Sequence, residues 1–333
     1  MLHIALTIIL VGACVTHFFG EQGHIHLRMD KAVSLPINHS NLSLFLWDFQ
    51  IVYDGDNPVD YISELRLLDR NKQPLVIDEG TLRMNKPLKY HYYRFCQSDY
   101  DSDERGVVLS YNYDPWGIGI TYTGYALLLV TMIAFFFQKQ SRFRAVLHSL
   151  SSRYPSRWTY IGFGVLAILI IVLAIVMTHV VTPKPPLQPV LQTPLLGIHV
   201  SVIMLSYTLF AIIAVLGIFG LCTKKLSIIS YQLSIVLLYP ALFCLTAGIF
   251  IGAIWANMSW GRYWGWDPKE TWALITMLVY ALLLHLPWLE SKVQISNLRY
   301  KICHHICCIV AFLFVLFTYF GVSYLLGGLH SYA

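Results

Sequence analysis

Charge is scarce in this sequence. Asp, Glu, Lys and Arg make up 12% of its 333 residues, about half of the roughly 25% found in soluble domains. Acid is almost absent outside one stretch, because fifteen of the eighteen Asp and Glu lie between residues 20 and 119. The net charge of +5 therefore averages an acidic soluble segment and a basic apolar body. Since no basic stripe or recognition helix accompanies that charge, we expect no nucleic-acid partner.

The sequence also lacks a disulfide framework. Only Cys96 lies in the acidic segment, so no second cysteine is there to pair with it. The other six lie in or beside apolar runs, where cysteine usually acts as a small hydrophobic residue: Cys14, Cys222, Cys244, Cys303, Cys307 and Cys308. The spacing in Cys303–Cys308, which includes two histidines, fits no zinc or CxxCH pattern. We expect that run to be a packed helix start near the interface.

What the sequence has in abundance is apolar runs. Hydrophobic residues make up 56% of the chain and the mean hydropathy is +0.59. A helix that crosses the ~30 Å hydrocarbon layer needs about 20 mostly apolar residues. Runs of this kind lie at 2–19, 120–137, 158–181, 198–220, 231–256, 271–288 and 302–326. We therefore expect an all-α polytopic membrane protein with about seven transmembrane helices, and a small extracytoplasmic β-rich domain inserted after the first helix.

The distribution of basic residues predicts the orientation. Lys and Arg concentrate in the connections at 138–157, 224–225 and 292–301, which all fall on one side if the N-terminus is cytoplasmic. On this orientation the outward side holds the segment 20–119, the loop 257–270 and the C-terminus. The expected membrane is a bacterial inner membrane. A cleaved signal peptide is the alternative for the first run, but no Lys or Arg precedes Arg28.

The acidic segment has a β pattern. Its runs Leu42–Tyr53, Tyr61–Leu68, Leu88–Phe95 and Gly106–Tyr113 mix β-branched and aromatic residues with polar ones. Stretches rich in Asp, Asn, Gly and Pro separate them, such as Asp54–Pro58. This pattern predicts a small antiparallel β domain with turn-rich connections.

Tryptophan is concentrated in one place. Five of the nine lie in or beside the loop 257–270: Trp255, Trp260, Trp264, Trp266 and Trp272. An aromatic belt at the membrane surface is the simplest interpretation, but it accounts for one or two tryptophans at each interface. Interleaved glycines, with Arg262 and Lys269, favour a flat apolar ligand that carries carboxylates, such as a porphyrin.

Asp267 has a structural interpretation that we rank above ligand binding. In Asp267–Glu270 the order Asp, Pro, Lys, Glu is typical of a helix start, with Asp as N-cap and Glu at the third position. Asp267 is thus expected to hold the loop first and to contact a ligand second.

The tryptophan loop resembles the signature of the WWD family of heme-handling proteins of cytochrome c assembly, in its CcsA (ResC) branch. Thr193–Ser201 and Gly327–Tyr332 resemble the flanking segments that carry this family's two external histidines. In the N-terminal third, Phe95–Asp101 and Gly106–Ser110 resemble the last part of the partner family, CcsB (ResB). The chain thus resembles a fusion of a shortened CcsB/ResB-like part, 1–137, with a CcsA/ResC-like heme-handling domain, 138–333.

This resemblance implies a ligand, a partner and a set of histidines. The ligand is heme, as heme b, with His199 and His330 as axial ligands of its iron; both are expected level with the loop. The partner is an apocytochrome c, whose CxxCH thiols would receive the heme through a heme lyase activity. His285 matches the family's intramembrane histidine, although a snorkelling interfacial histidine is an equal alternative.

Three points stay open at this stage. The family's second intramembrane histidine has no secure counterpart here, because His3 and His17 are only weak candidates. A separate CcsB/ResB-type subunit that supplies this histidine is therefore one expected partner. Thiol-reducing proteins are another expected partner. A heme exporter or carrier without synthase activity is the first alternative function. A membrane electron-transfer subunit with b-type heme is the second, and the outward position of the histidine pair counts against it.

Overall fold

The computed structural model describes residues 1–29, 31–35, 43–68, 80–153, 189–222, 224–293 and 297–326. The chain divides into two compact units. The N-terminal unit consists of Met1–Thr131, Pro183–Leu196 and Gly252–Trp264. The helical unit consists of Met132–Thr182, Gly197–Ile251 and Gly265–Ala333.

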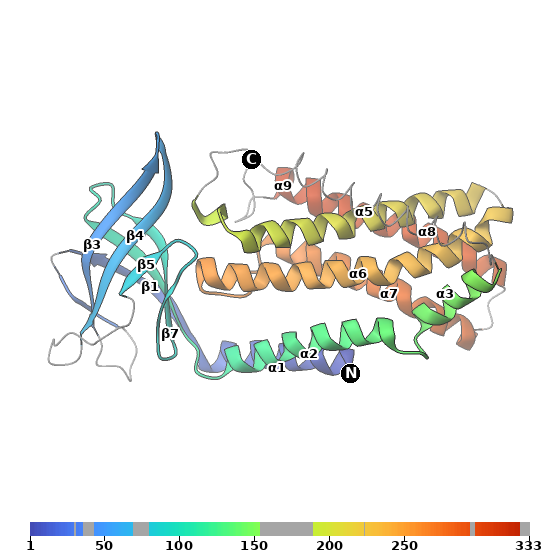
Figure 1. Ribbon diagram of the computed structural model, residues 1–333, viewed down its shortest axis with the longest axis horizontal. Coiled ribbons are helices and arrows are strands. Elements are labelled where there is room, and N and C mark those ends of the chain that lie inside the picture. Colours follow the sequence, from blue (N-terminus) through green and yellow to red (C-terminus); the bar gives the residue numbers. More distant parts are fainter. Residues whose placement is uncertain are drawn as a thin grey trace. The chain divides into compact units, whose positions relative to one another are not determined.

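Two antiparallel four-stranded sheets form the β part of the N-terminal unit (Figure 1). The strand order of the first sheet is β1 (Glu21–Arg28), β8 (Gly106–Tyr113), β7 (Tyr93–Tyr100) and β6 (Leu88–Tyr90). The order of the second is β2 (Val33–Ser34), β3 (Ser43–Asp54), β4 (Asn57–Leu68) and β5 (Thr81–Arg83). A short 3-10 helix, η1 (Pro189–Leu191), also belongs to this unit.

The two sheets share one apolar core. Alternate residues of each strand are buried, as in Leu44 and Leu46 of β3 and Leu65 and Leu67 of β4, and they join Phe95 of the other sheet in a single cluster. Because side chains alternate between the faces of a strand, this pattern buries one face of each sheet and leaves the other exposed. The β-rich domain predicted from the sequence is therefore a β-sandwich.

One predicted strand is wrong in detail. The run Leu88–Phe95 forms two strands, β6 and β7, which pair with each other through Tyr90 and Tyr93. The chain turns at His91, which adopts a positive φ of 50°. Aromatic residues continue through this turn without a Gly, Pro or Asn, so the sequence gives no sign of it.

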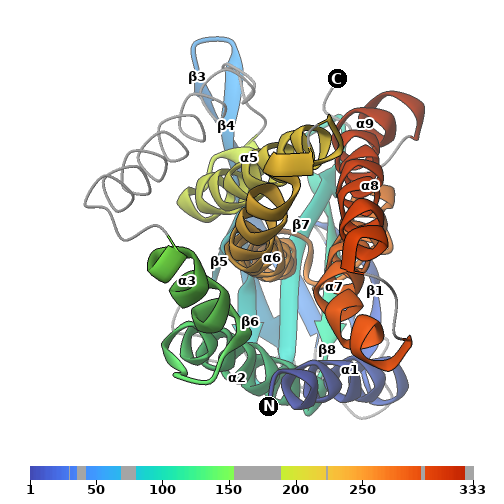
Figure 2. The same ribbon diagram turned by 90° about the vertical axis from the view of Figure 1, so that its right-hand side faces the viewer.

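Helices α1 (Leu2–Phe19) and α2 (Gly117–Phe137) flank the β-sandwich in the chain and lie side by side (Figures 1 and 2). Asp114 joins them. Its Oδ2 accepts a hydrogen bond from Thr16 Oγ1 at 2.6 Å, and its Oδ1 accepts one from the Gly117 amide at 2.7 Å. This carboxylate thus satisfies an orphan N–H at the start of α2 and ties that start to the end of α1.

The helical unit is built from long apolar helices, which Figure 2 views nearly end-on. They are α5 (Pro194–Cys222), α6 (Lys224–Trp260), α7 (Pro268–Val293) and α8 (Asn297–Leu316), the last continued by a π-helical turn η2 (Phe317–Gly321) and α9 (Val322–Leu325). With the N-terminal pair, six helices of the described chain are long and apolar enough to cross a membrane. The protein is a polytopic helical membrane protein with a β region in its N-terminal part.

Two features of the helical unit bear on the predicted topology. The predicted span 158–181 lies outside the described residues. The predicted basic connection 138–157 contains a helix, α3 (Arg142–Arg153), whose start is capped by a hydrogen bond from the Arg144 amide to Ser141 Oγ at 3.3 Å. Sequence reasoning missed this helix because its apolar positions are few and its length falls short of a span.

The pair His304 and His305 is packed inside the helical unit. Both side chains are fully buried, and Ser234 Oγ and Ser227 Oγ lie 2.9 and 3.3 Å from their respective Nε2 atoms. The predicted packing is confirmed for these two histidines, but the run lies inside α8, which begins at Asn297, and is not its start. Its position near a membrane interface stays a prediction. Among the residues described, no group of three or more His, Cys, Asp or Glu side chains is arranged to hold a metal ion.

Candidate functional site

The second half of the tryptophan loop is a capped helix start in the helical unit. The Lys269 amide donates to Asp267 Oδ1 at 2.9 Å, and the Asp267 amide donates to Glu270 Oε2 at 3.2 Å. This is the reciprocal arrangement of a capping box, as the sequence predicts. The same Glu270 oxygen accepts the Gly265 amide at 2.8 Å, so one carboxylate fixes the three residues that precede the helix.

Two tryptophans belong to this half of the loop. Trp266 is 74% exposed and has a positive φ of 54°, which a bulky residue rarely adopts. Trp272, one turn into α7, is half-buried against Phe317, with ring centroids 4.3 Å apart. Lys269 Nζ donates to Ser323 Oγ of α9 at 3.1 Å. The structure thus presents Trp266 outward and uses Trp272 in helix packing.

His199 lies near the start of α5 in the same unit. Its Nδ1 is 2.8 Å from the Gly248 carbonyl oxygen of α6. A carbonyl oxygen only accepts hydrogen bonds, so Nδ1 carries the proton and Nε2 of the neutral ring carries the lone pair. Metal-ligating histidines are typically fixed in this way through the nitrogen that does not bind the metal.

The other two predicted histidines differ in what the structure says of them. His330 lies outside the described residues. His285 is exposed near the C-terminal end of α7, where its Nδ1 is 2.8 Å from the Ala281 carbonyl of its own helix. At 1.5 Å per residue, His285 is ~26 Å along the helix from Pro268. Its roles in heme entry and binding stay predictions.

The first half of the loop belongs to the N-terminal unit, where it is held by the β-sandwich. Asn112 Nδ2 of β8 donates to the Gly261 carbonyl at 2.8 Å, and Ser259 Oγ donates to Asn85 Oδ1 at 2.6 Å. Gly261 has a φ of 75°, a conformation that glycine adopts without strain. The Tyr263 ring contacts the edge of Tyr122 in α2, with centroids 5.6 Å apart.

The tryptophans of this first half are unequal in exposure. Trp255 is 2% exposed and packs edge-on against Trp260, with ring centroids 4.9 Å apart. Trp260 and Trp264 are half-buried, and Arg262 is exposed. Burial gives Trp255 a packing role, whereas ligand stacking by any of these rings stays a prediction.

Asn257 is a polar residue of this region that sequence reasoning did not single out. It is 1% exposed, and neither its Oδ1 nor its Nδ2 has a hydrogen-bond partner among the described residues. A buried amide in this state is rare, since native proteins pair almost all such groups. A lone Asn at the end of an apolar run was the only signal for it in the sequence.

Cys96 is the one thiol in the β-sandwich. It is buried and free, and burial raises the pKa of its thiol to about 12. Since the thiolate is the reactive form, a pKa this high keeps Cys96 in its less reactive thiol form at neutral pH.

Membrane-length helices combined with a β-sandwich that fixes part of a tryptophan-rich loop define a class: polytopic membrane proteins that carry a β module. Residues 121–330 match the model of the cytochrome c assembly protein family. Residues 1–112 match the ResB-like family. The protein belongs to the cytochrome c assembly family, and a ResB-like N-terminal part is fused to its assembly domain.

Curated relatives agree with this assignment. The chain is 42% identical over 169 residues to Protein NrfI of Wolinella succinogenes. The aligned residues make up 47% of this chain and 18% of that protein. It is 40% identical over 166 residues to the cytochrome c biogenesis protein CcsA of Chlamydomonas reinhardtii, or 44% of this chain and 43% of that protein. With CcsA of Arabidopsis thaliana the identity is 44% over 88 residues, a quarter of each chain. The chain thus spans less than half the length of these relatives.

Proposed function

We propose that this protein binds heme b at the outer face of a bacterial inner membrane and presents it to the CxxCH thiols of an apocytochrome c. The observation that carries the proposal is the hydrogen bond from His199 Nδ1 to the Gly248 carbonyl at 2.8 Å. It sets the tautomer and the orientation that an axial ligand of heme iron requires. His330 is the second axial ligand in this proposal, by resemblance to the family.

The loop supports this proposal in two ways. Its capped second half holds the exposed Trp266 ring in place, and an indole face stacks well on a flat porphyrin. The exposed Arg262 carries the charge that pairs with a heme propionate. Trp260 and Trp264 are the further stacking candidates, whereas Asp267 acts by holding the loop.

The chemistry in this proposal belongs mainly to heme and the apocytochrome. Each cysteine S–H adds across a vinyl C=C of heme: a C–S bond forms, and the hydrogen goes to the other vinyl carbon. The addition needs no net oxidant or reductant, but it needs free thiols, so we include thiol-reducing proteins among the partners. The protein supplies orientation, which converts a bimolecular encounter into a positioned reaction.

We also propose the route and the sidedness. The N-terminus faces the cytoplasm, the loop and the C-terminus face outward, and heme enters at His285 on the inner side. A second intramembrane histidine would come from a separate CcsB/ResB-type subunit, because α1 offers only His3 and His17.

The test is the absorption spectrum of the purified full chain together with the yield of a co-expressed cytochrome c. His199→Ala and His330→Ala, alone and combined, are expected to abolish the heme absorption and the cytochrome. His24→Ala, at an exposed position of β1, is the matched control and should leave both unchanged. An unchanged spectrum and yield in the double variant would refute the ligand assignment.

The same purified protein and co-expressed cytochrome, with quinone added as a reductant, separate the alternative functions. A heme exporter or carrier predicts heme capture without thioether formation in cells that lack other assembly factors. An electron-transfer subunit predicts reduction of the bound heme by a quinone. Our proposal expects heme to be attached to the cytochrome by the unaltered chain, and this attachment to be lost in His199→Ala and in His330→Ala.

A further inference from the structure

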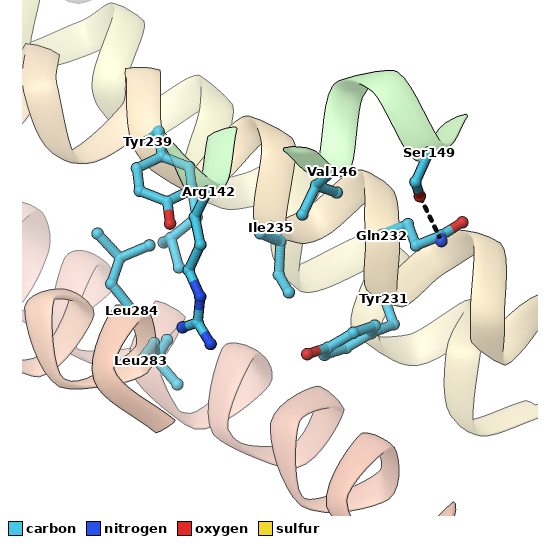
Figure 3. Close-up of a pocket in the computed structure, with 10 residues that line it drawn as sticks. Arg142, Val146, Ser149, Tyr231, Gln232, Ile235, Tyr239, Leu283 and Leu284 are labelled. Carbon is cyan, nitrogen blue, oxygen red and sulfur yellow. Dashed lines mark hydrogen bonds between the residues drawn. The ribbon is translucent and has the colours of Figure 1, made fainter. Parts of the chain in front are cut away.

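A cavity of about 230 Å³ lies in the helical unit between α3, α6 and α7 (Figure 3). Helix α3 contributes Arg142 and Ser149, α6 contributes Tyr231 and Gln232, and α7 closes one wall with apolar residues that include Leu283. Figure 3 shows the Arg142 side chain reaching from α3 toward the leucines of α7. None of these residues belongs to the tryptophan loop or to the histidines discussed above.

The walls of this cavity are fixed by direct contacts. The Phe143 ring of α3 meets the edge of Tyr239 in α6, with centroids 5.9 Å apart. About two helical turns away from the ring contact, Gln232 Nε2 donates to Ser149 Oγ at 3.1 Å. Helix α3 is therefore docked on α6 by an aromatic contact and a hydrogen bond, with the cavity between them.

The polar groups of the cavity define what it can hold. Arg142 supplies a positive charge, and no acidic residue is among the residues that line the cavity. Gln232 Oε1 is buried and has no hydrogen-bond partner in the described part of the chain. Because an unsatisfied buried acceptor costs about 1–3 kcal/mol, a turn of the Gln232 side chain toward a ligand that donates a hydrogen bond is favoured. The ligand therefore combines an anion, a hydrogen-bond donor and an apolar body.

Heme does not meet these requirements. Its propionates are acceptors at neutral pH and offer Gln232 Oε1 no donor. An anionic phospholipid meets all three requirements, with a phosphodiester for Arg142, headgroup hydroxyls for Gln232 and acyl chains for the leucine wall.

We propose that this cavity is a binding site for an anionic phospholipid whose headgroup carries hydroxyls, as in phosphatidylglycerol. The position of the cavity favours this occupant, since α3 is a basic amphipathic helix that follows directly on the membrane helix α2. Basic segments next to a membrane span attract anionic lipids. The bound lipid ties α3 to α6 and α7, and the proposal does not depend on the tryptophan loop or on the pair His199 and His330.

The test is native mass spectrometry of the purified full chain, titrated with short-chain dioctanoylphosphatidylglycerol. We expect saturable binding, weaker by roughly tenfold in Arg142→Gln, the loss of about one charge-assisted hydrogen bond. Arg144→Gln is the matched control, because it removes the same charge from the same helix outside the cavity lining. It should bind as the unaltered chain does. Size-exclusion profiles and helical circular dichroism verify that each variant is folded.

The headgroup preference has its own test. Dioctanoylphosphatidylmethanol carries the same charge without hydroxyls, so the unaltered chain should bind it several-fold less tightly. In Gln232→Leu this preference should disappear while charge-dependent binding remains. Equal binding of the two lipids by the unaltered chain, or equal affinity of Arg142→Gln, would overturn the proposal. So would competition by inorganic phosphate at the same concentration, which indicates a phosphate site only, or by hemin, which indicates a heme pocket.

Discussion

The contact between α5 and α6 at Gly248 sets the position of His199, and one added methyl group tests it. In Gly248→Ala the new Cβ would lie 2.5 Å from Ile203 Cδ1 and 2.8 Å from its Cγ1. Ile203 is 9% exposed, so its side chain has little room to move aside. Overpacking of this kind costs about 1–3 kcal/mol. We expect the free energy of unfolding of Gly248→Ala to fall by this amount.

The same change acts on His199 through the Gly248 carbonyl. Relief of the clash separates α5 from α6 and lengthens the 2.8 Å bond from His199 Nδ1 to that oxygen. Loss of a hydrogen bond that orients a ligand typically lowers metal affinity by about 10–100-fold. Gly248→Ala should therefore bind heme more weakly than the unaltered chain by about 10–100-fold.

Gly197→Ala is the matched control. Gly197 lies in α5 two residues before His199, and a Cβ there meets open space. Alanine in a helix is more stable than glycine by about 0.5–1 kcal/mol, so this variant should be neutral or slightly stabilised. Thermal unfolding in detergent and a heme titration followed at the Soret band measure both effects. Equal heme affinity in the two variants would refute the coupling between Gly248 and His199.

Two further predictions concern the loop cap and the buried thiol. Asp267→Ala should lower the free energy of unfolding by about 0.5–2 kcal/mol, whereas Asp267→Asn, which keeps an N-cap acceptor, should lose less; equal losses in thermal unfolding would contradict the cap. Cys96 has a pKa raised to about 12 by burial, so in the folded protein iodoacetamide should leave it unmodified at about pH 8 and label it only above about pH 11. Denaturation restores an ordinary thiol pKa of ~8.5, so peptide mass spectrometry should find Cys96 labelled at about pH 8 only in the unfolded chain.

Local signals in the sequence predicted the helices and the loop cap well. Transmembrane helices follow from apolar length alone, and each of the six candidate spans of the described chain overlaps most of a predicted run. The capping box at Asp267 was equally accessible, because it depends on residues three positions apart. Such features depend only on neighbours in the chain.

Contacts between residues that are distant in the chain could not be predicted from the sequence. The sequence gives no sign that the His199 ring bonds to a carbonyl 49 residues later, or that Asn112 of a strand holds Gly261. Both contacts involve backbone oxygens, which every residue has, so no residue type reveals them. The two buried histidines of α8 were predicted to pack, but their serine partners lie 70 and 78 residues away in the chain.

The strained backbone of Trp266, next to the cap, supports a functional role for this residue that composition alone does not indicate. Trp266 holds a φ of 54° while its side chain is 74% exposed, so burial of the indole offsets little of the cost. A left-handed conformation costs a residue other than glycine roughly 1–2 kcal/mol. Glu270 maintains it, because its Oε2 binds the amides on both sides of Trp266, those of Gly265 and Asp267. Strain kept in place by a dedicated carboxylate is typical of functional positions, and here it holds one indole outward, as the stacking role that we propose for Trp266 requires.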